Sequence, residues 1–276
     1  MRIEFTKMHG LGNDFVLLDG FRQPIRLTSA QVRALADRHF GIGCDQVLLI
    51  EPDADPGVDV RYRIFNAEGE EVEQCGNGAR CIARYLVEAG RAVRAEIRAA
   101  TMTGIITLYP EGGDRVRVNM GVPFFEPAGI PLLAEQRRSG YSVDTGAGQV
   151  EFMAVSMGNP HAVIVVPDSA AAKVERVAAA LQASQCFPQG VNVGFMQIHD
   201  PARIKLRVYE RGVGETLACG SGACAAMACG RLYQGLASEV EIGLQGGQLV
   251  VSWQGEGQPV WMTGPATTVY KGQIEL

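Results

Sequence analysis

Two cysteines stand at the start of the same short pattern, and this pattern could support acid–base chemistry. Cys75 begins Cys-Gly-Asn-Gly-Ala, and Cys219 begins Cys-Gly-Ser-Gly-Ala. Each pattern leads into an apolar, helix-compatible stretch, at 79–89 and 223–233. The N–H groups and the dipole at a helix N-terminus favour an anion. We therefore expect each turn to bind a carboxylate and each thiol to have thiolate character near neutral pH.

The two patterns belong to a longer internal repeat. The segment 63–79 aligns without a gap on 207–223, an offset of 144 residues (219 minus 75), and Arg, Glu, Cys, two Gly and Ala match. A second similarity links Gly-Asn-Asp-Phe at 12–15 with Gly-Asn-Pro-His at 158–161. The sequence therefore predicts two similar halves, each with one cysteine turn.

Two matching thiols suit a reaction that inverts a stereocentre. If the halves face each other, one thiolate removes a proton from one face of a carbon, and the other thiol delivers a proton to the opposite face. The two helix ends would hold the substrate carboxylate, where negative charge builds up during deprotonation. We therefore predict an amino-acid epimerase that needs no cofactor, with Cys75 and Cys219 as its acid and base.

Short strands and few helices are expected to position these turns. Alternating polar and apolar residues predict strands at 61–65, 115–120, 204–209, 240–244 and 249–253, the last two forming a hairpin around Gly246-Gly247. Helices are predicted at 28–38 and 168–182. Short turns between strands imply antiparallel or mixed sheets. The apolar stretch after each cysteine is expected to be a helix buried in the sheet of its own half.

The boundary between the halves is expected near 120–127. The first half is then residues 1–120 and the second half residues 121–264. The remaining tail, residues 265–276, is expected to return to the first half. A chain of 276 residues is long enough for two such cores.

Composition excludes several classes of protein. A net charge of −5 with four lysines and no basic cluster argues against nucleic-acid and anionic-membrane binding. The chain has no basic and apolar leader and no run of eighteen apolar residues, so a soluble cytoplasmic protein is expected. Seven cysteines without an export signal argue against a disulfide framework. Cys219, Cys224 and Cys229 do not share a helix face, and no Cys-x-x-Cys occurs, so no metal site is expected.

The motifs along nearly the whole chain resemble those of the diaminopimelate epimerases. The resemblance is carried by Gly12-Asn-Asp-Phe15, Gly41-Ile-Gly-Cys-Asp-Gln46, Phe65-Asn66, Cys75-Gly-Asn-Gly78, Gly158-Asn-Pro-His161, Asn192, Tyr209-Glu-Arg211 and Ala218-Cys-Gly-Ser-Gly-Ala223. It implies interconversion of LL-2,6-diaminopimelate and its meso isomer in the synthesis of lysine and peptidoglycan precursors. Neither pyridoxal phosphate nor a metal would take part.

The resemblance also implies a fold and a set of site residues. The fold is α+β, with two pseudo-symmetric domains from an internal duplication, each a mostly antiparallel or mixed, barrel-like β-sheet wrapped around a central helix. The protein is expected to be a homodimer, and we place Tyr270 at its interface. Substrate contacts are implied for Asn13, Gln46, Asn66, Gly76, Asn77, Asn159, Asn192, Glu210, Arg211, Gly220 and Ser221. His161 and Glu210 are implied to tune the thiols.

The repeat is broken near the cysteines. Asn66 in the first half corresponds to Glu210 in the second, and Phe15 corresponds to His161. We expect these differences to make the two thiols unequal. We also expect polar residues from one side to bind the distant amino-acid end of the substrate and to discriminate against smaller amino acids.

Three other functions stay open at this point. The first is another cysteine-pair racemase, of the proline or hydroxyproline type, which would need no polar contacts to a distant ammonium and carboxylate. The second is a thiol redox or sensor protein in which Cys75 and Cys219 form a regulatory disulfide. The third is an amino-acid binding module without catalytic activity.

Overall fold

The computed structural model describes residues 2–72, 75–92, 94–145 and 148–275, so Met1 and Leu276, at the outer ends of the predicted first half and tail, lie outside the described residues. The chain forms two compact units. Unit 1 comprises Met1–Asn119 and Thr263–Leu276, and unit 2 comprises Met120–Met262. Strand β17 (Trp261–Pro265) contains the second boundary.

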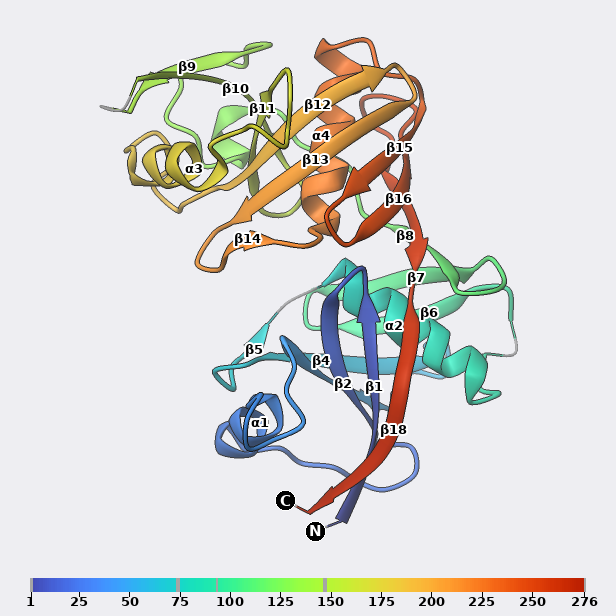
Figure 1. The fold of residues 1–276 in the computed structure, drawn as a ribbon. Coiled ribbons are helices and arrows are strands. Elements are labelled where there is room, and N and C mark those ends of the chain that lie inside the picture. The colour runs from blue at the N-terminus through green and yellow to red at the C-terminus, as the bar shows by residue number, and fades with distance from the viewer. Residues whose placement is uncertain (1, 73–74, 93, 146–147, 276) are drawn as a thin grey trace. The chain divides into compact units, whose positions relative to one another are not determined.

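Unit 1 is a mixed sheet with two helices among its described residues. Its elements are β1 (Arg2–Gly10), β2 (Asn13–Asp19), α1 (Ser29–Ala36), β3 (Gln46–Glu51), β4 (Val60–Asn66), β5 (Glu71–Val72), α2 (Gly76–Glu88), β6 (Ile97–Thr101), β7 (Gly104–Pro110), β8 (Arg115–Asn119) and β18 (Thr267–Glu275). Figure 1 shows them in blue to green, with β18 in red.

Most strands of unit 1 pair with their neighbours in the sequence. β1 is antiparallel to β2, β2 is parallel to β3, and β3 is antiparallel to β4. β4 pairs with the short β5 in antiparallel fashion and with β6 in parallel fashion. The C-terminal strand β18 pairs with β1 from Arg2–Glu275 to His9–Thr267. The C-terminal tail is therefore part of the sheet of unit 1.

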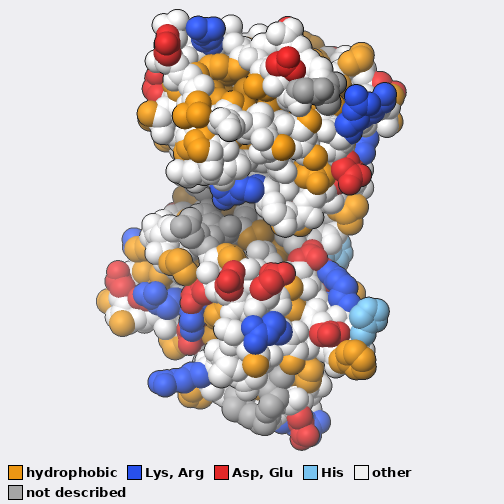
Figure 2. All heavy atoms as spheres, turned by 90° about the vertical axis from the view of Figure 1, so that its left-hand side faces the viewer, with side chains coloured by type: hydrophobic (Ala, Val, Ile, Leu, Met, Phe, Trp, Pro, Cys, Tyr) orange, Lys and Arg blue, Asp and Glu red, His pale blue; other side chains and the backbone are white. Residues whose placement is uncertain are grey.

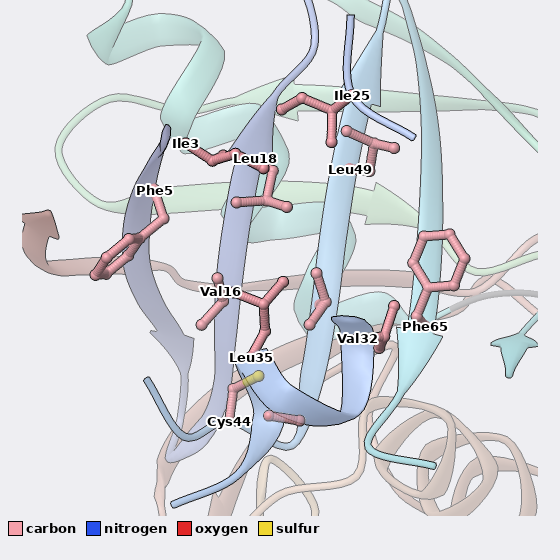
Figure 3. Packing of buried hydrophobic residues seen from close by; sticks show 12 residues of the cluster. Ile3, Phe5, Val16, Leu18, Ile25, Val32, Leu35, Cys44, Leu49 and Phe65 are labelled. Carbon is pink, nitrogen blue, oxygen red and sulfur yellow. The ribbon is translucent and has the colours of Figure 1, made fainter. Parts of the chain in front are cut away.

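Helix α1 covers one part of this sheet. Its N-terminus is a capping box, in which Thr28 Oγ1 accepts from the Gln31 N–H and the Gln31 side chain accepts from the Thr28 N–H. Val32 and Leu35 then face a cluster of apolar strand residues that includes Val16 and Leu49 (Figure 3). This packing holds the chain that leads from α1 to the start of β3.

Helix α2 is the buried helix of unit 1. It contacts β1, β2, β3, β7, β8 and β18. Residues 77–83 are all buried, and Arg80 is 0 % exposed. The sheet therefore surrounds much of the helix and fixes the position of its first turn.

Unit 2 contains a second set of strands and helices. Its elements are the short 3-10 helix η1 (Pro127–Gly129), β9 (Tyr141–Asp144), β10 (Gln149–Ser156), β11 (Pro160–Val165), α3 (Val174–Ala183), β12 (Asn192–Asp200), β13 (Arg203–Glu210), β14 (Gly214–Thr216), α4 (Gly220–Tyr233), β15 (Glu239–Leu244) and β16 (Gly247–Ser252). Figure 1 shows them in green to orange-red.

The strand pairings of unit 2 repeat those of unit 1. β10 and β11 are antiparallel, β11 and β12 are parallel, and β12 and β13 are antiparallel, as for β1 to β4. β13 pairs with the short β14 in antiparallel fashion and with β15 in parallel fashion, as β4 does with β5 and β6. β15 and β16 form the predicted hairpin. Each unit on its own is thus an α+β arrangement with a mixed, mostly antiparallel sheet.

Helix α4 is made mainly of small residues. Residues 222–230 are all buried, and the helix contacts β10, β11, β12, β13 and β16. A Cβ on Gly230 would lie 2.3 Å from Leu236 Cδ1, and a Cβ on Gly222 would lie 3.1 Å from Val208. Small side chains are therefore what allows this helix to pack closely on every side.

Three helices begin three or more residues away from the predicted start. α2 and α4 each begin three residues before the predicted apolar stretch, at the glycine that follows the cysteine. α3 begins at Val174 rather than at Asp168. The Asp168 carboxylate accepts from the Ala170 N–H, and Ser169 donates to Gln197, so these side chains hold a turn instead of a first helical turn.

The surface shows no segregation of charge on the face drawn in Figure 2. Basic and acidic side chains are interspersed there. Within the described part of the chain, no helix is both long enough and apolar enough to cross a membrane.

We predict that Gly41→Ala destabilises the protein by about 3 kcal/mol. Gly41 lies between α1 and β3, and a Cβ there would stand 1.9 Å from the backbone oxygen of Ala34. The measurement is the midpoint of urea unfolding, with Gly140→Ala as control, because the nearest atom to a Cβ on Gly140 is 4.0 Å away. Equal stability of the two variants would show that the Gly41 loop adjusts without cost.

Candidate active site

Cys75 is the N-cap of α2. Its backbone is extended, with φ −138° and ψ 115°, and the helix begins at the next residue, Gly76. The thiol is partly buried and donates to Asn13 Oδ1 over 3.6 Å. A Cβ on Gly78 would lie 3.2 Å from Leu48 Cδ2. Glycine at this position therefore lets the first turn of α2 approach the sheet that carries Asn13.

Asn13 is the first residue of β2 and links Cys75 to two other side chains. Its Nδ2 donates to Asp45 Oδ2 over 2.9 Å, and its Oδ1 accepts from Asn77 Nδ2 over 3.1 Å. Asn77 Oδ1 in turn accepts from Arg80 Nη2 over 2.8 Å. Arg80 also donates to the backbone oxygen of Pro265. A continuous row of hydrogen bonds thus runs past the Cys75 thiol.

Asp45 is held by a charged cluster at the start of β3. Its Oδ2 also accepts from the Asp14 N–H, and its Oδ1 accepts from Arg38 Nη2 over 2.7 Å. Asp14 accepts from both Arg38 and Lys7. Burial opposes ionisation of Asp14, but hydrogen bonds from Arg38 and Lys7 outweigh it and hold the pKa of this carboxyl below its usual range. Asp14 is therefore charged at neutral pH.

Strand register places Gln46 and Asn66 side by side. In the pairings of β2, β3 and β4, Phe15 lies opposite Gln46, and Gln46 lies opposite Asn66. The Gln46 Oε1 atom is buried and accepts no hydrogen bond in the described structure, so it is an acceptor available to a ligand. The Asn66 side chain instead holds a turn, because it donates to Glu70 Oε2 and accepts from the Glu70 N–H.

Cys219 occupies the corresponding place in unit 2. It is the N-cap of α4, with φ −119° and ψ 112°, and it is buried. Its thiol donates to Glu210 Oε2 over 3.0 Å, and the other oxygen of Glu210 accepts from Thr216 Oγ1 over 2.6 Å. Ser221 Oγ lies 3.6 Å from the sulfur. Cys219 therefore faces a carboxylate where Cys75 faces an amide.

The surroundings of Cys219 favour the thiol. Burial raises the pKa of Cys219 well above its ordinary value, and the charge and hydrogen bond of Glu210 raise it further. The Gly222 N–H, a donor of the helix end, acts in the opposite direction with a smaller effect. The expected thiolate character at this helix end is thus wrong for Cys219 in this structure, because desolvation and a like charge outweigh the helix N-terminus.

His161 is buried beside polar groups of the same unit. Its Nε2 lies 2.9 Å from Asn159 Oδ1. Burial, assisted by the charge of Arg211, lowers the pKa of His161 to about 3. The imidazole is therefore neutral at pH 7 and donates from Nε2 to the amide oxygen. Asn192, paired with His161 across β11 and β12, accepts from the Arg211 N–H and so ties the end of β13 to this group.

The remaining predicted residues fall in different places. Gly76 and Gly220 are the first residues of α2 and α4, where helix N–H groups point outward. The Arg211 guanidinium donates to the backbone oxygen of Gln189 over 2.6 Å. Tyr270 lies on β18, is 47 % exposed and packs edge-on against Phe5. Tyr270 is therefore placed in the C-terminal strand rather than with the polar residues around Cys75.

Three residues that hold the polar groups around the cysteines were not predicted from the sequence: Asp45, Arg80 and Thr216. Arg80 carried a signal, because it is a charged residue in the stretch predicted to be a buried helix, and its counterpart in the repeat is Cys224. Asp45 lies inside the motif at 41–46, but we assigned it no role of its own. Thr216 had no signal, since its contact with Glu210 depends on the turn between β13 and β14.

The acidic and thiol side chains of the site are not arranged as metal ligands. Among the described residues, no three His, Cys, Asp or Glu side chains are grouped so that they could hold a metal ion. The groups around each cysteine are instead neutral amides, hydroxyls and single carboxylates. This donor set fits proton transfer and hydrogen bonding to an amino acid.

Comparison with known proteins gives a match along most of the sequence. The family model described as diaminopimelate epimerase matches residues 5–125 and 153–269. A protein of Nitrosospira multiformis named diaminopimelate epimerase is 53 % identical over 276 residues, which cover 100 % of this chain and 99 % of the relative.

Solved structures with low sequence identity have the same fold. A hydroxyproline epimerase from Agrobacterium vitis matches with a TM-score of 0.71 and 15 % identity, covering 99 % of this chain and 92 % of the other. A PhzF-family phenazine biosynthesis protein from Bacillus anthracis has a TM-score of 0.71 and 17 % identity, covering 100 % of both chains. A probable proline racemase from Agrobacterium radiobacter has a TM-score of 0.70 and 18 % identity, covering 99 % and 93 %.

We predict that Glu210→Gln lowers the pKa of Cys219, because the like charge and the anionic acceptor are both lost. Thiolate at Cys219 then forms at lower pH than in the parent. The measurement is a pH titration of the Cβ resonance of carbon-13-labelled Cys219. The control is Glu215→Gln, whose carboxylate is paired with Arg207. Coincident titration curves for the parent and Glu210→Gln would contradict the role given to Glu210.

Proposed function

Because the chain belongs to the diaminopimelate epimerase family, we propose that Cys75 and Cys219 are the two acid–base groups of its reaction. The activity is that of an isomerase of lysine biosynthesis that acts on diaminopimelate. The 53 % identity to a full-length diaminopimelate epimerase favours this substrate over the proline-type substrates of the low-identity structures.

The observation that carries the proposal is the matching position of the two sulfurs. Each cysteine is the N-cap of the buried helix in its unit, and each thiol donates to a polar side chain of a neighbouring strand. Cys219 retains its proton, which is the state required of the acid. Cys75 is then the base that removes the α-proton when substrate is bound.

Protons balance over one turnover. The Cys75 thiolate takes the proton from the α-carbon of one isomer, and the Cys219 thiol delivers its own proton to the opposite face, which gives the other isomer. Cys75 ends as thiol and Cys219 as thiolate, which is the starting state for the reverse direction. The Glu210 carboxylate disfavours a thiolate at Cys219. Neutral His161 is the second residue to which we assign a role in tuning the thiols.

The first turns of α2 and α4 would hold the carboxylate at the reacting centre. Gly76 and Asn77 begin one helix, and Gly220 and Ser221 begin the other. Their N–H groups and the helix dipole stabilise the negative charge that develops as the α-proton leaves. Asn13 Oδ1 and Gln46 Oε1 are acceptors for the ammonium group beside this carboxylate.

The distant amino-acid end of diaminopimelate would bind the remaining polar residues. These are Asn66, Asn159, Asn192 and Arg211. An arginine and three amides can pair with the second ammonium and carboxylate, and a substrate without them leaves these groups unpaired. This cost would exclude smaller amino acids.

We also propose that the chain arose by duplication and assembles as a dimer. The repeated strand pairings, and the division of the chain at Asn119 and Met120, support two pseudo-symmetric epimerase halves, 1–120 with the tail 265–276, and 121–264, that arose by duplication. We place the enzyme in the cytoplasm as a homodimer, with Tyr270 at the interface. The exposure of Tyr270 and of Val269 on β18 supports this interface.

We predict that Cys75→Ala and Cys219→Ala each lower the rate of epimerisation by about a thousandfold or more, because each variant lacks one of the two proton-transfer groups. The measurement follows LL-diaminopimelate in deuterated water, where the parent incorporates deuterium at the α-carbon as the meso isomer forms. Cys186→Ala is the control, because Cys186 is a partly buried thiol that contacts Ser184.

Two outcomes would contradict the two-base proposal. One is epimerisation at the parent rate by either single variant. The other is a parent that binds diaminopimelate but exchanges no α-proton, as a redox sensor or a binding module would.

We predict that Tyr270→Glu converts the homodimer to a monomer of 29.6 kDa. A carboxylate buried at an interface without a partner costs several kcal/mol. Sedimentation equilibrium gives the mass of each variant. Phe40→Glu is the control, because Phe40 is also an aromatic residue of unit 1 and is 96 % exposed. A dimeric Tyr270→Glu, or a monomeric Phe40→Glu, would place the interface elsewhere.

A further inference from the structure

The direction of the Asn13 side chain is fixed by an ion at each end of a row of hydrogen bonds. The row runs from Asp45 through Asn13 and Asn77 to Arg80. An amide can usually turn over and exchange its oxygen and nitrogen with little change in shape. Here the two ends of the row decide between the two orientations.

The Asp45 end admits only a donor. Asp45 is an acceptor towards its other neighbours, because Oδ2 accepts from the Asp14 N–H and Oδ1 accepts from Arg38, with which it forms an ion pair. The atom of Asn13 that lies 2.9 Å from Asp45 Oδ2 must therefore be the NH₂ nitrogen. The carbonyl oxygen of Asn13 consequently points the other way, towards Cys75 and Asn77.

The Arg80 end admits only an acceptor and enforces the same direction. A guanidinium has donors and no acceptor, so the atom of Asn77 that lies 2.8 Å from Arg80 Nη2 must be the oxygen. The NH₂ group of Asn77 then faces Asn13. Arg80 is 0 % exposed and also donates to the backbone oxygens of Pro265 and Gly76, so its position is fixed by the core of unit 1.

We propose that Asp45 and Arg80 are positioning residues that keep the Asn13 carbonyl directed at the Cys75 sulfur. A carbonyl accepts a hydrogen bond from a thiol, whereas an NH₂ group in its place would donate one to a thiolate. The fixed direction therefore disfavours the Cys75 thiolate in the empty site. Glu210, oriented by Thr216, has the same effect on Cys219 through a carboxylate.

The test compares the rate at which iodoacetamide alkylates Cys75 in the empty protein at pH 7. With Asp45→Asn, residue 45 accepts or donates, so Asn13 is released to turn its NH₂ group towards the sulfur. The expected result is about threefold faster alkylation of Cys75. Mass spectrometry of the peptides measures Cys75 and Cys186 together, and Cys186 in unit 2 is the internal reference. Asp200→Asn, which removes another carboxylate paired with an arginine, is the control and keeps the parent rate.

The other end of the row supplies a second pair of variants. Arg80→Met removes the donor that fixes Asn77 and is expected to accelerate Cys75 alkylation by a similar factor, about threefold. Arg80→Lys retains a cationic donor and is expected to react close to the parent rate. This rescue distinguishes the direction of the amides from a general loss of packing around a buried side chain.

The alkylation rates of Cys75 and Cys186 in these variants decide the proposal. Faster alkylation of Cys75 alone in Asp45→Asn and Arg80→Met, with Arg80→Lys like the parent, supports the proposal. An unchanged Cys75 rate in Asp45→Asn overturns it, and so does equal acceleration of Cys75 and Cys186, which would report loosened structure. The inference rests on the proposed role of Cys75, but its readout uses no substrate. A failure of deuterium exchange in the parent would contradict the proposed function and leave the alkylation result intact.

Discussion

The structure depends on the burial of one helix within the sheet of each unit. α2 and α4 contact strands on several sides, and a buried helix with that many neighbours cannot turn or slide without losing packing over most of its length. The start of the helix is therefore fixed by the core, and with it the N-cap cysteine.

On this repeated framework the two thiols face different acceptors. Cys75 faces an uncharged amide whose direction is set by Asp45 and Arg80, and Cys219 faces the Glu210 carboxylate, which Thr216 holds at its other oxygen. A carboxylate disfavours a neighbouring thiolate more strongly than an amide does, because it carries charge. The two halves thus use one geometry to place two thiols beside acceptors of different charge. A two-base reaction needs a difference of this kind, since one group must begin with its proton and the other without.

Much of the framework could be predicted from the sequence, whereas the partners of the cysteines could not. The repeat around Cys75 and Cys219 located both N-caps, and the alternation at 204–209 located β13. Helix starts were less accurate, because Gly76 and Gly220 carry no apolar side chain to signal a helix and Asp168 caps a turn instead. The contact of Asn13 with Asp45 joins residues 32 positions apart, and the elevated pKa of Cys219 reflects burial by the whole unit. Neither the Asn13–Asp45 contact nor the pKa of Cys219 can be predicted from a local sequence pattern.

The buried arginine of α2 marks a difference between the cores of the two halves. Arg80 corresponds to Cys224 in the repeat, and Cys224 lies within a run of α4 in which every residue is buried and none is charged. A guanidinium at position 224 would need acceptors that unit 1 supplies through Asn77 and backbone oxygens, and Ser221 now stands in the place of Asn77. The two halves are therefore not interchangeable. A tandem of either half alone would carry two thiols with the same surroundings.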